Sequence, residues 1–130
     1  MKQVAAAVAM HDGMVLVTRR APGEKLAGMW EFPGGKLEPG ETVQQCIVRE
    51  LDEELGVAAR AGDVIAKTVY TYAGGVIELI AVEVVLLDKT LRLSVHDAFK
   101  WVFPDELLGL ELAPADIPIA EEIIRRHGQH

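Results

Sequence analysis

The sequence predicts an α+β fold in which a mixed β-sheet lies between helices. Short apolar runs rich in β-branched residues recur along the chain, one segment with helical periodicity interrupts them, and a second helical segment closes the chain. This order of elements fits one layered domain over residues 1–130. With 50% hydrophobic and 25% charged residues, the chain has the composition of a globular protein that buries a core.

The first strands form a predicted hairpin. Val4–Met10 and Met14–Arg20 are apolar runs on either side of Asp12-Gly13, a dipeptide that is typical of tight turns between strands. Trp30–Phe32 alternates as a short strand would, and the prolyl-glycyl-glycine segment 33–35 is expected to break it.

The clearest predicted helix covers Thr42–Leu55. Thr42 followed three residues later by Gln45 fits a capping box, and Gly56 stands where a helix commonly stops. The residues expected on its buried side, from their spacing of about 100° per residue, are Ile47, Val48, Leu51 and Leu55.

The second half of the chain repeats the pattern of strands followed by a helix. Val64–Tyr72 and Val76–Leu87 are predicted strands joined by a glycine-containing turn, and Phe99–Phe103 is a further short strand. Asp105–Leu108 is expected to form one helical turn, and Ile117–His127 has the apolar spacing of a closing helix.

Charge and cysteine usage limit the possible partners. The net charge of −7 argues against binding a nucleic acid polymer, whereas a small anionic substrate is compatible with an acidic protein when a metal ion lies between them. No apolar run approaches the roughly 20 residues that cross a membrane. The single cysteine, Cys46, is expected to be a small buried hydrophobe, which fits the cytoplasm.

Three glutamates of the predicted helix, Glu50, Glu53 and Glu54, share one stripe because their spacing is i, i+3 and i+4. A solvated acidic face with Arg49 paired to Glu53 explains this pattern. The alternative is a site for a hard divalent cation such as Mg²⁺, which prefers oxygen ligands and shares them with substrate phosphates.

The segment around this helix separates the two interpretations. The stretch GGKLEPGETVQQCIVRELDEELGV resembles the signature of the Nudix hydrolase family at every specified position. At average residue usage, the chance of such a match is on the order of 10⁻¹⁰ per starting point. The matching positions are Gly35, Glu41, Arg49, Glu50, Leu51, Glu53, Glu54, Gly56 and Val57.

The resemblance extends beyond this segment. LAGMWEFPGGKLEPGE is similar to the MutT-type branch, and the tail LAPADIPIAEEII is similar to that of bacterial CTP pyrophosphohydrolases. The resemblance implies an α/β/α sandwich and hydrolysis of a nucleoside triphosphate to a monophosphate and pyrophosphate. The expected substrates are (d)CTP and modified dCTP; 8-oxo-dGTP hydrolysis and a non-catalytic nucleotide-binding module are the alternatives. The expected protein is a monomer or homodimer that acts on a small molecule.

By the same resemblance, the metal ion is Mg²⁺, with Mn²⁺ as a substitute. Glu53 and Glu54 would be ligands together with the backbone carbonyl of Gly34, and Glu50 would bind a further metal or act as general base. Arg49 would orient Glu50 through a charge-assisted hydrogen bond. Independently of the family, glycines at this point are expected to let the backbone turn sharply and approach a metal or phosphate closely.

Outside the helix, the resemblance places Arg20 and Lys36 at the phosphates. Many MutT-type proteins carry a further glutamate six residues before the tryptophan that corresponds to Trp101, whereas this chain has Val95. Either the helix glutamates suffice, or Asp97 or His96 substitutes, although a surface or hydrogen-bonding role is the favoured explanation of the histidine.

Two residues are candidates for contact with the base. Phe32 is expected to stack on it, to pack in the core, or both. Asp116 precedes the final helix, where an N-cap is its plain role. In the MutT-type branch the corresponding position helps to recognise the base. An ionised carboxylate offers acceptors only, which favours a base edge with amino hydrogens such as cytosine N4.

Overall fold

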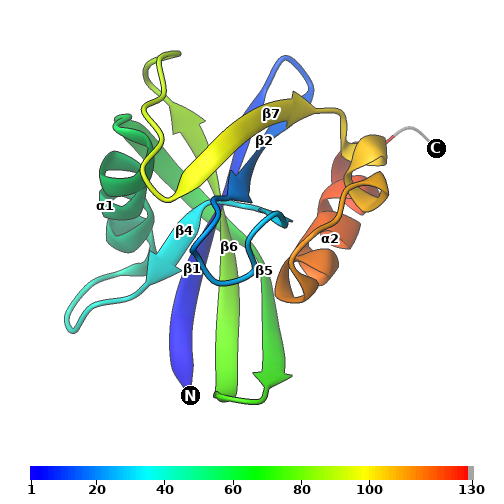
Figure 1. Ribbon diagram of the computed structural model, residues 1–130. Helices are drawn as coiled ribbons and strands as arrows, with labels where there is room; N and C mark the ends of the chain where they lie inside the picture. Colours follow the sequence, from blue (N-terminus) through cyan, green and yellow to red (C-terminus); the bar gives the residue numbers. More distant parts are fainter. Residues whose placement is uncertain (129–130) are drawn as a thin grey trace.

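A mixed β-sheet lies between two α-helices in the computed structural model, which describes residues 1–128 (Figure 1). The last two residues of the predicted domain, 129 and 130, lie outside the described part. In chain order the strands and helices are β1 (Lys2–His11), β2 (Met14–Arg20), β3 (Trp30–Glu31), β4 (Gly34–Lys36), α1 (Val43–Leu55), β5 (Ala59–Tyr72), β6 (Gly75–Leu86), β7 (His96–Val102) and α2 (Ile117–His127).

The strand order of the sheet is β3-β2-β1-β6-β5, with β4 paired to β1 and β7 paired to β2. β1 and β6 are parallel, whereas the other described strand pairs are antiparallel. The predicted mixed sheet between helices is therefore confirmed. None of the helices within the described residues is both long enough and apolar enough to span a membrane.

β1 contributes side chains to both halves of the core because successive residues of a strand point to opposite faces. Ala5, Ala7 and Ala9 pack on the side of α1, whereas Ala6 and Val8 pack on the side of α2. The run of alanines lets α1 lie close to the centre of the sheet.

Helix α1 begins and ends where the sequence predicts. The capping box between Thr42 and Gln45 is present, and Gly56 adopts the left-handed conformation that terminates the helix. One prediction for its buried face is wrong: Val48 is exposed, and the buried Cys46 lies toward the sheet in its place. Within the acidic stripe of this helix, Glu50 lies directly beside Gly35 of β4.

The expected break after the short strand is present, since β3 ends at Glu31, but the glycines do not form it: Gly34 and Gly35 belong to β4 and pair with Ala6 and Ala5 of β1. Neither glycine has a left-handed φ. They are needed for close packing rather than for a turn. A Cβ on Gly34 would lie 1.9 Å from the carbonyl oxygen of Ala5.

The remaining differences concern the ends of elements. β5 begins at Ala59, upstream of the predicted Val64, because register shifts accommodate Gly62 within the strand. β7 begins at His96 rather than Phe99 because it pairs along β2. The predicted helical turn after β7 is present as a 3₁₀ turn, Pro104–Gly109.

Candidate active site

Arg49 is the centre of a charged network on α1. Its guanidinium donates to both carboxylate oxygens of Glu41, at 2.6 and 3.0 Å. Nη1 of Arg49 also donates to Glu50 at 2.9 Å and to Glu53 at 3.2 Å. The pairing with Glu53, which a solvated acidic face would explain, is thus one contact of a network that also holds Glu50. The arrangement is the one expected if Arg49 orients Glu50.

The network fixes the segment that leads into α1. Glu41 accepts a hydrogen bond from the backbone of Glu38 at 2.9 Å, and Arg49 donates to the backbone carbonyl of Lys36 at 3.1 Å. The hydrogen bond from Arg49 lowers the pKa of Glu41 to about 2, and the same contact raises the pKa of Arg49. Glu41 is therefore ionised at any physiological pH, and hydrogen bonds from Arg49 tie both Glu41 and the end of β4 to α1.

The glycine pair brings β4 against two of the helix glutamates. The Cα of Gly35 lies so close to Glu50 that a Cβ there would approach the carboxylate carbon to 2.3 Å. The backbone amide of Gly34 stabilises the ionised form of Glu54. The structure therefore brings together Gly34, Glu50 and Glu54, three of the residues predicted to bind metal. Glu53, the fourth, is more exposed, with 55% of its side chain accessible.

Glu54 has the environment of a carboxylate that needs a cation. Its Oε1 atom is buried and has no hydrogen-bond partner among the described residues. Burial, followed by the charges of Glu50 and Glu31, raises the pKa of Glu54 to about 8, although Arg20 opposes the shift. A divalent cation would satisfy the buried oxygen and offset the repulsion. Within residues 1–128 no three potential ligand side chains already converge on one point. The donor set of carboxylates and a backbone carbonyl suits Mg²⁺ or Mn²⁺.

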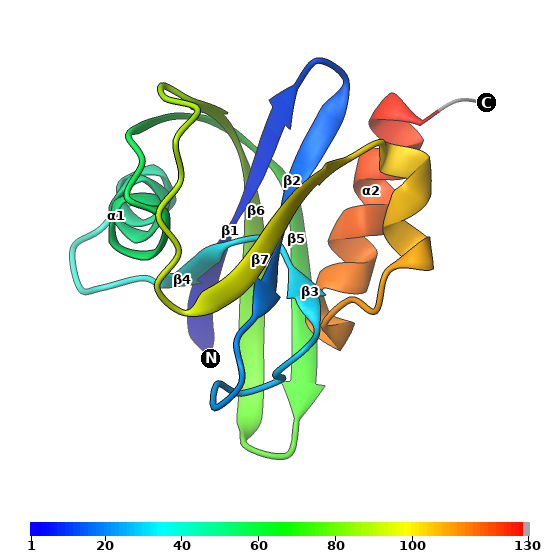
Figure 2. The same ribbon diagram turned by 45° about the horizontal axis from the view of Figure 1, so that its top comes forward.

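A cleft of about 290 Å³ lies next to this cluster. Its floor comes from β1 and β6, and its sides come from β3, β4 and the segment before α2. Figure 2 shows β3 beside the N-terminal end of α2. Every predicted substrate-binding residue lines the cleft: Arg20, Phe32, Lys36 and Asp116.

Arg20 has several partners within the protein. Its guanidinium donates to the carbonyl of Lys25 at 3.1 Å, to Glu31 at 3.3 Å and to Glu24 at 3.5 Å. In this structure Arg20 holds the loop after β2 against the cleft, and the exposed Lys36 is less constrained. Contact of either residue with phosphates stays a prediction.

Asp116 is buried at the point where the segment before α2 lines the cleft. It occupies the N-cap position of α2, but its carboxylate makes no capping bond. Oδ2 instead accepts the backbone N–H of Phe32 at 3.0 Å. Burial and the charge of Glu31 raise the pKa of Asp116 to about 7. Phe32 lines the cleft but is only 3% exposed, so packing in the core is one of its roles.

The region around Val95 reveals a residue that the sequence argument missed. Asp97 pairs with Arg19 on the surface, at 2.7 Å. His96 is buried, and its Nε2 lies 2.8 Å from Oε2 of Glu31 on β3. Glu31 thus joins the site, and its charge acts on both Glu54 and Asp116. The sequence did hold one signal for Glu31. It lies between the buried Trp30 and Phe32, and the alternation of side chains along a strand directs it to the opposite face of the sheet from these two residues.

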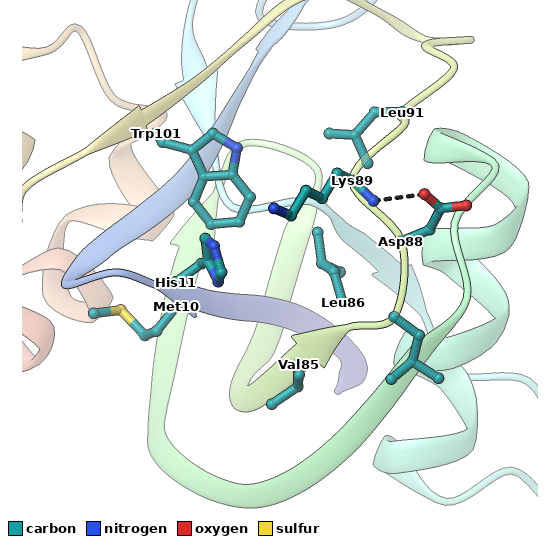
Figure 3. Close-up of a pocket in the computed structure, with 9 residues that line it drawn as sticks. Met10, His11, Val85, Leu86, Asp88, Lys89, Leu91 and Trp101 are labelled. Carbon is teal, nitrogen blue, oxygen red and sulfur yellow. Dashed lines mark hydrogen bonds between the residues drawn. The ribbon is translucent and has the colours of Figure 1, made fainter.

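A separate cavity of about 380 Å³ lies between the end of β1 and the segment after β6 (Figure 3). His11 and Trp101 meet edge to face at 6.1 Å along its wall, beside aliphatic side chains such as Leu86 and Leu91. None of the predicted site residues lines this cavity. Trp101 thus lies outside the cleft that holds Asp116.

Comparisons with known proteins agree with this geometry. The model of the NUDIX domain matches residues 1–126. A CTP pyrophosphohydrolase of Escherichia coli K12 is 43% identical over 121 residues, spanning 93% of this chain and 90% of that protein. A putative 8-oxo-dGTP diphosphatase of Mycobacterium tuberculosis is 40% identical over 124 residues, spanning 89% of this chain and 84% of that protein.

Solved structures share the fold over nearly the whole chain. The solution structure of the E. coli ORF135 protein has a TM-score of 0.84 at 41% identity and covers 96% of this chain and 89% of its own. The MutT protein from Methanosarcina mazei Go1 has a TM-score of 0.86 at 24% identity, covering 98% and 96%. The chain therefore belongs to the Nudix hydrolase family, whose members cleave phosphorus-containing anhydrides.

Proposed function

We propose that this protein is a Mg²⁺-dependent pyrophosphohydrolase that converts a nucleoside triphosphate to a nucleoside monophosphate and pyrophosphate. The observation that carries the proposal is the unsatisfied Glu54 oxygen beside Gly34, next to a cleft that is lined by a second buried carboxylate, Asp116. Glu54 suits a metal ion with phosphates, and Asp116 suits a hydrogen-bonding base.

Glu53, Glu54 and the Gly34 carbonyl are the proposed metal ligands, and Glu50 either joins them or acts as general base. When bound, the metal ion neutralises phosphate oxygens and lowers the pKa of a bound water. Mn²⁺ is expected to replace Mg²⁺ because both accept carboxylate oxygens in octahedral sites.

The protein's own residues orient these groups. Arg49 holds Glu50 at 2.9 Å and Glu53 at 3.2 Å, so the Glu50 carboxylate is oriented whether it binds metal or acts as general base. Burial raises the pKa of Glu50, which brings it closer to the range useful for a general base. The exposed Lys36 lines the cleft, and its ammonium group would attract the phosphates.

Cytosine is the base that we propose to bind at Asp116. The ionised Asp116 carboxylate can accept the N4 amino hydrogens of cytosine while keeping the backbone contact to Phe32. The similarity to the E. coli CTP pyrophosphohydrolase supports (d)CTP and modified dCTP as substrates. The similarity to the M. tuberculosis protein makes 8-oxo-dGTP the second candidate.

A substrate panel tests this preference. We expect kcat/KM for CTP, dCTP and 5-methyl-dCTP to exceed that for 8-oxo-dGTP, with pyrophosphate as product, and ADP-ribose to be turned over slowly. Much faster hydrolysis of 8-oxo-dGTP than of all three cytidine nucleotides would refute the base assignment. A protein that binds CTP but releases no pyrophosphate with Mg²⁺ would instead be a nucleotide-binding module.

We further propose that the protein acts in the cytoplasm on free nucleotides, as a monomer or homodimer. Its single thiol, Cys46, is unpaired and fully buried, which suits a reducing compartment. The net charge of −7 disfavours binding to nucleic acid polymers.

A further inference from the structure

We propose that Glu31, held in place by His96, supplies to the metal site the carboxylate that is absent at Val95. Glu31 would be a metal-site residue, and His96 would be its positioning residue. This inference rests on the proposed metal-dependent function and adds a residue of this chain to that site.

Ser94 and His96 link the end of α1 to β3, and Val95 lies between them. The N–H and the hydroxyl of Ser94 both donate to the carbonyl of Glu54, each at 3.2 Å. Two residues later, His96 contacts Glu31. Val95 therefore lies between the residue tied to Glu54 and the residue tied to Glu31, but its side chain has no oxygen to offer.

His96 and Arg20 both hold Glu31 through one oxygen of its carboxylate. The His96 side chain is fully buried, and its Nε2 lies 2.8 Å from Oε2 of Glu31. Arg20 donates to the same oxygen at 3.3 Å. Both contacts use Oε2, so neither involves Oε1, and Glu31 itself lines the cleft. Fixing a ligand through its other atoms is how outer residues commonly prepare a metal site.

The negative charge of Glu31 acts on two neighbouring carboxyl groups. Glu31 is near enough to Glu54 and Asp116 to raise the pKa of both carboxyl groups. A second carboxylate near Glu54, whose buried Oε1 has no hydrogen-bond partner among the described residues, is unfavourable unless a cation lies between them. A cation bound at Glu54 would relieve this repulsion, and the positive charge of Arg20 would offset part of the negative charge of the two carboxylates.

Metal binding is the direct test because it does not depend on turnover. Mn²⁺ affinity would be measured by isothermal titration calorimetry and electron paramagnetic resonance on the full chain without nucleotide. We expect Glu31→Gln to weaken Mn²⁺ binding at least tenfold. Asp97→Asn, which removes a neighbouring carboxylate outside the site, should leave the affinity within about twofold of the parent. Unchanged affinity in Glu31→Gln, or equal losses in both variants, would overturn the proposal.

Rescue variants test whether Glu31 stands in for position 95 and whether His96 positions it. Adding Val95→Glu to Glu31→Gln should restore most of the Mn²⁺ affinity. Failure to restore it would contradict the claim that Glu31 stands in for a carboxylate at position 95. His96→Leu should weaken Mn²⁺ binding about tenfold, whereas His96→Gln, which keeps a donor, should bind nearly as the parent does. Equal affinities of these two folded variants would refute the positioning role.

These outcomes are separable from the proposed function. If the parent protein hydrolyses CTP to CMP and pyrophosphate while Glu31→Gln binds Mn²⁺ normally, the inference on Glu31 is wrong and the function stands. If Mn²⁺ binding depends on Glu31 but no triphosphate is hydrolysed, the function is wrong and the assignment of Glu31 stands.

Discussion

Asp116 illustrates how one buried group can set the substrate preference at the residue scale. Its pKa of about 7 follows from burial and from Glu31, with the Phe32 amide as a partial counterweight. The carboxylate is therefore divided between ionised and neutral forms near pH 7. The sequence alone indicated the residue type but could not show this pKa, because Asp116 meets Phe32 and Glu31, which lie far away in the chain, only in the folded protein.

A pH titration of substrate affinity tests the role of Asp116. The ionised form accepts the cytosine amino group, so KM for CTP should rise about tenfold per pH unit as the pH falls below 7. Asp116→Asn keeps an acceptor for the Phe32 amide but does not titrate, so its KM should be nearly independent of pH between 6 and 8. It should also shift the ratio of kcat/KM toward 8-oxo-dGTP. A parent KM that does not change over this range would contradict the assignment.

At the scale of elements, the site depends on the close approach of β4 to both β1 and α1. Gly34 faces the backbone of β1, whereas Gly35 faces the carboxylate of Glu50 on α1. The sequence predicted α1 well because its cap, its apolar spacing and its stop residue are all local signals. It failed at β4 because the glycine pair forms a strand only through contacts with β1.

A matched pair of substitutions separates these two contacts. Gly34→Ala would place a Cβ 1.9 Å from the Ala5 carbonyl oxygen, so the strands must move apart; we expect a loss of about 3 kcal/mol of unfolding free energy. Gly35→Ala would instead meet the end of the Glu50 side chain rather than backbone, so the carboxylate can shift away from Arg49 and the cost should be about 1 kcal/mol or less. Its kcat should nevertheless fall about 100-fold because the carboxylate is misplaced. Urea unfolding and steady-state kinetics of both variants check the contrast, and similar stability losses would contradict it.

At the scale of the whole molecule, the site is assembled from segments spread over the entire sequence. The family signature identified the helix glutamates and the glycines before them, and the cleft contains all four predicted substrate-binding residues. Glu31 escaped prediction, although a hydrogen-bonding role for His96 was expected, because 65 residues separate the two and they meet only where β3 and β7 both pair with β2.

The same assembly leaves a signature in the pH dependence of stability. Without metal, the pKa values of Glu54 and Asp116 are raised to about 8 and about 7, so their ionisation in the folded state opposes folding. The stability that the two protonated carboxyl groups contribute is fully present below their unfolded pKa values near 4. It is lost as the pH rises through the folded pKa values of about 7 and 8. The lowered pKa values of Glu41 and Glu122, both about 2, affect stability only below about pH 4.5.

We therefore expect the unfolding free energy of the metal-free protein to rise by about 2 kcal/mol when the pH is lowered from 8.5 to 5.5. The rise is limited to this size because water that reaches Glu54 screens part of the charge penalty. Mg²⁺ should stabilise the protein at pH 8.5 more than at pH 5.5, and Glu54→Gln should remove most of this difference. Urea unfolding in EDTA or Mg²⁺ provides the measurement. A metal effect independent of both pH and Glu54 would place the ion elsewhere.

The central claim is that helix glutamates direct metal-dependent cleavage of a triphosphate to a monophosphate and pyrophosphate. Phosphorus-31 NMR of CTP incubated with the protein and Mg²⁺ tests it most directly, with Glu53→Gln as the matched variant. We predict CMP and pyrophosphate in equal amounts, and a large loss of turnover in Glu53→Gln with stability changed by about 0.5 kcal/mol. CDP and inorganic phosphate as products, or near-normal activity in Glu53→Gln, would contradict the account.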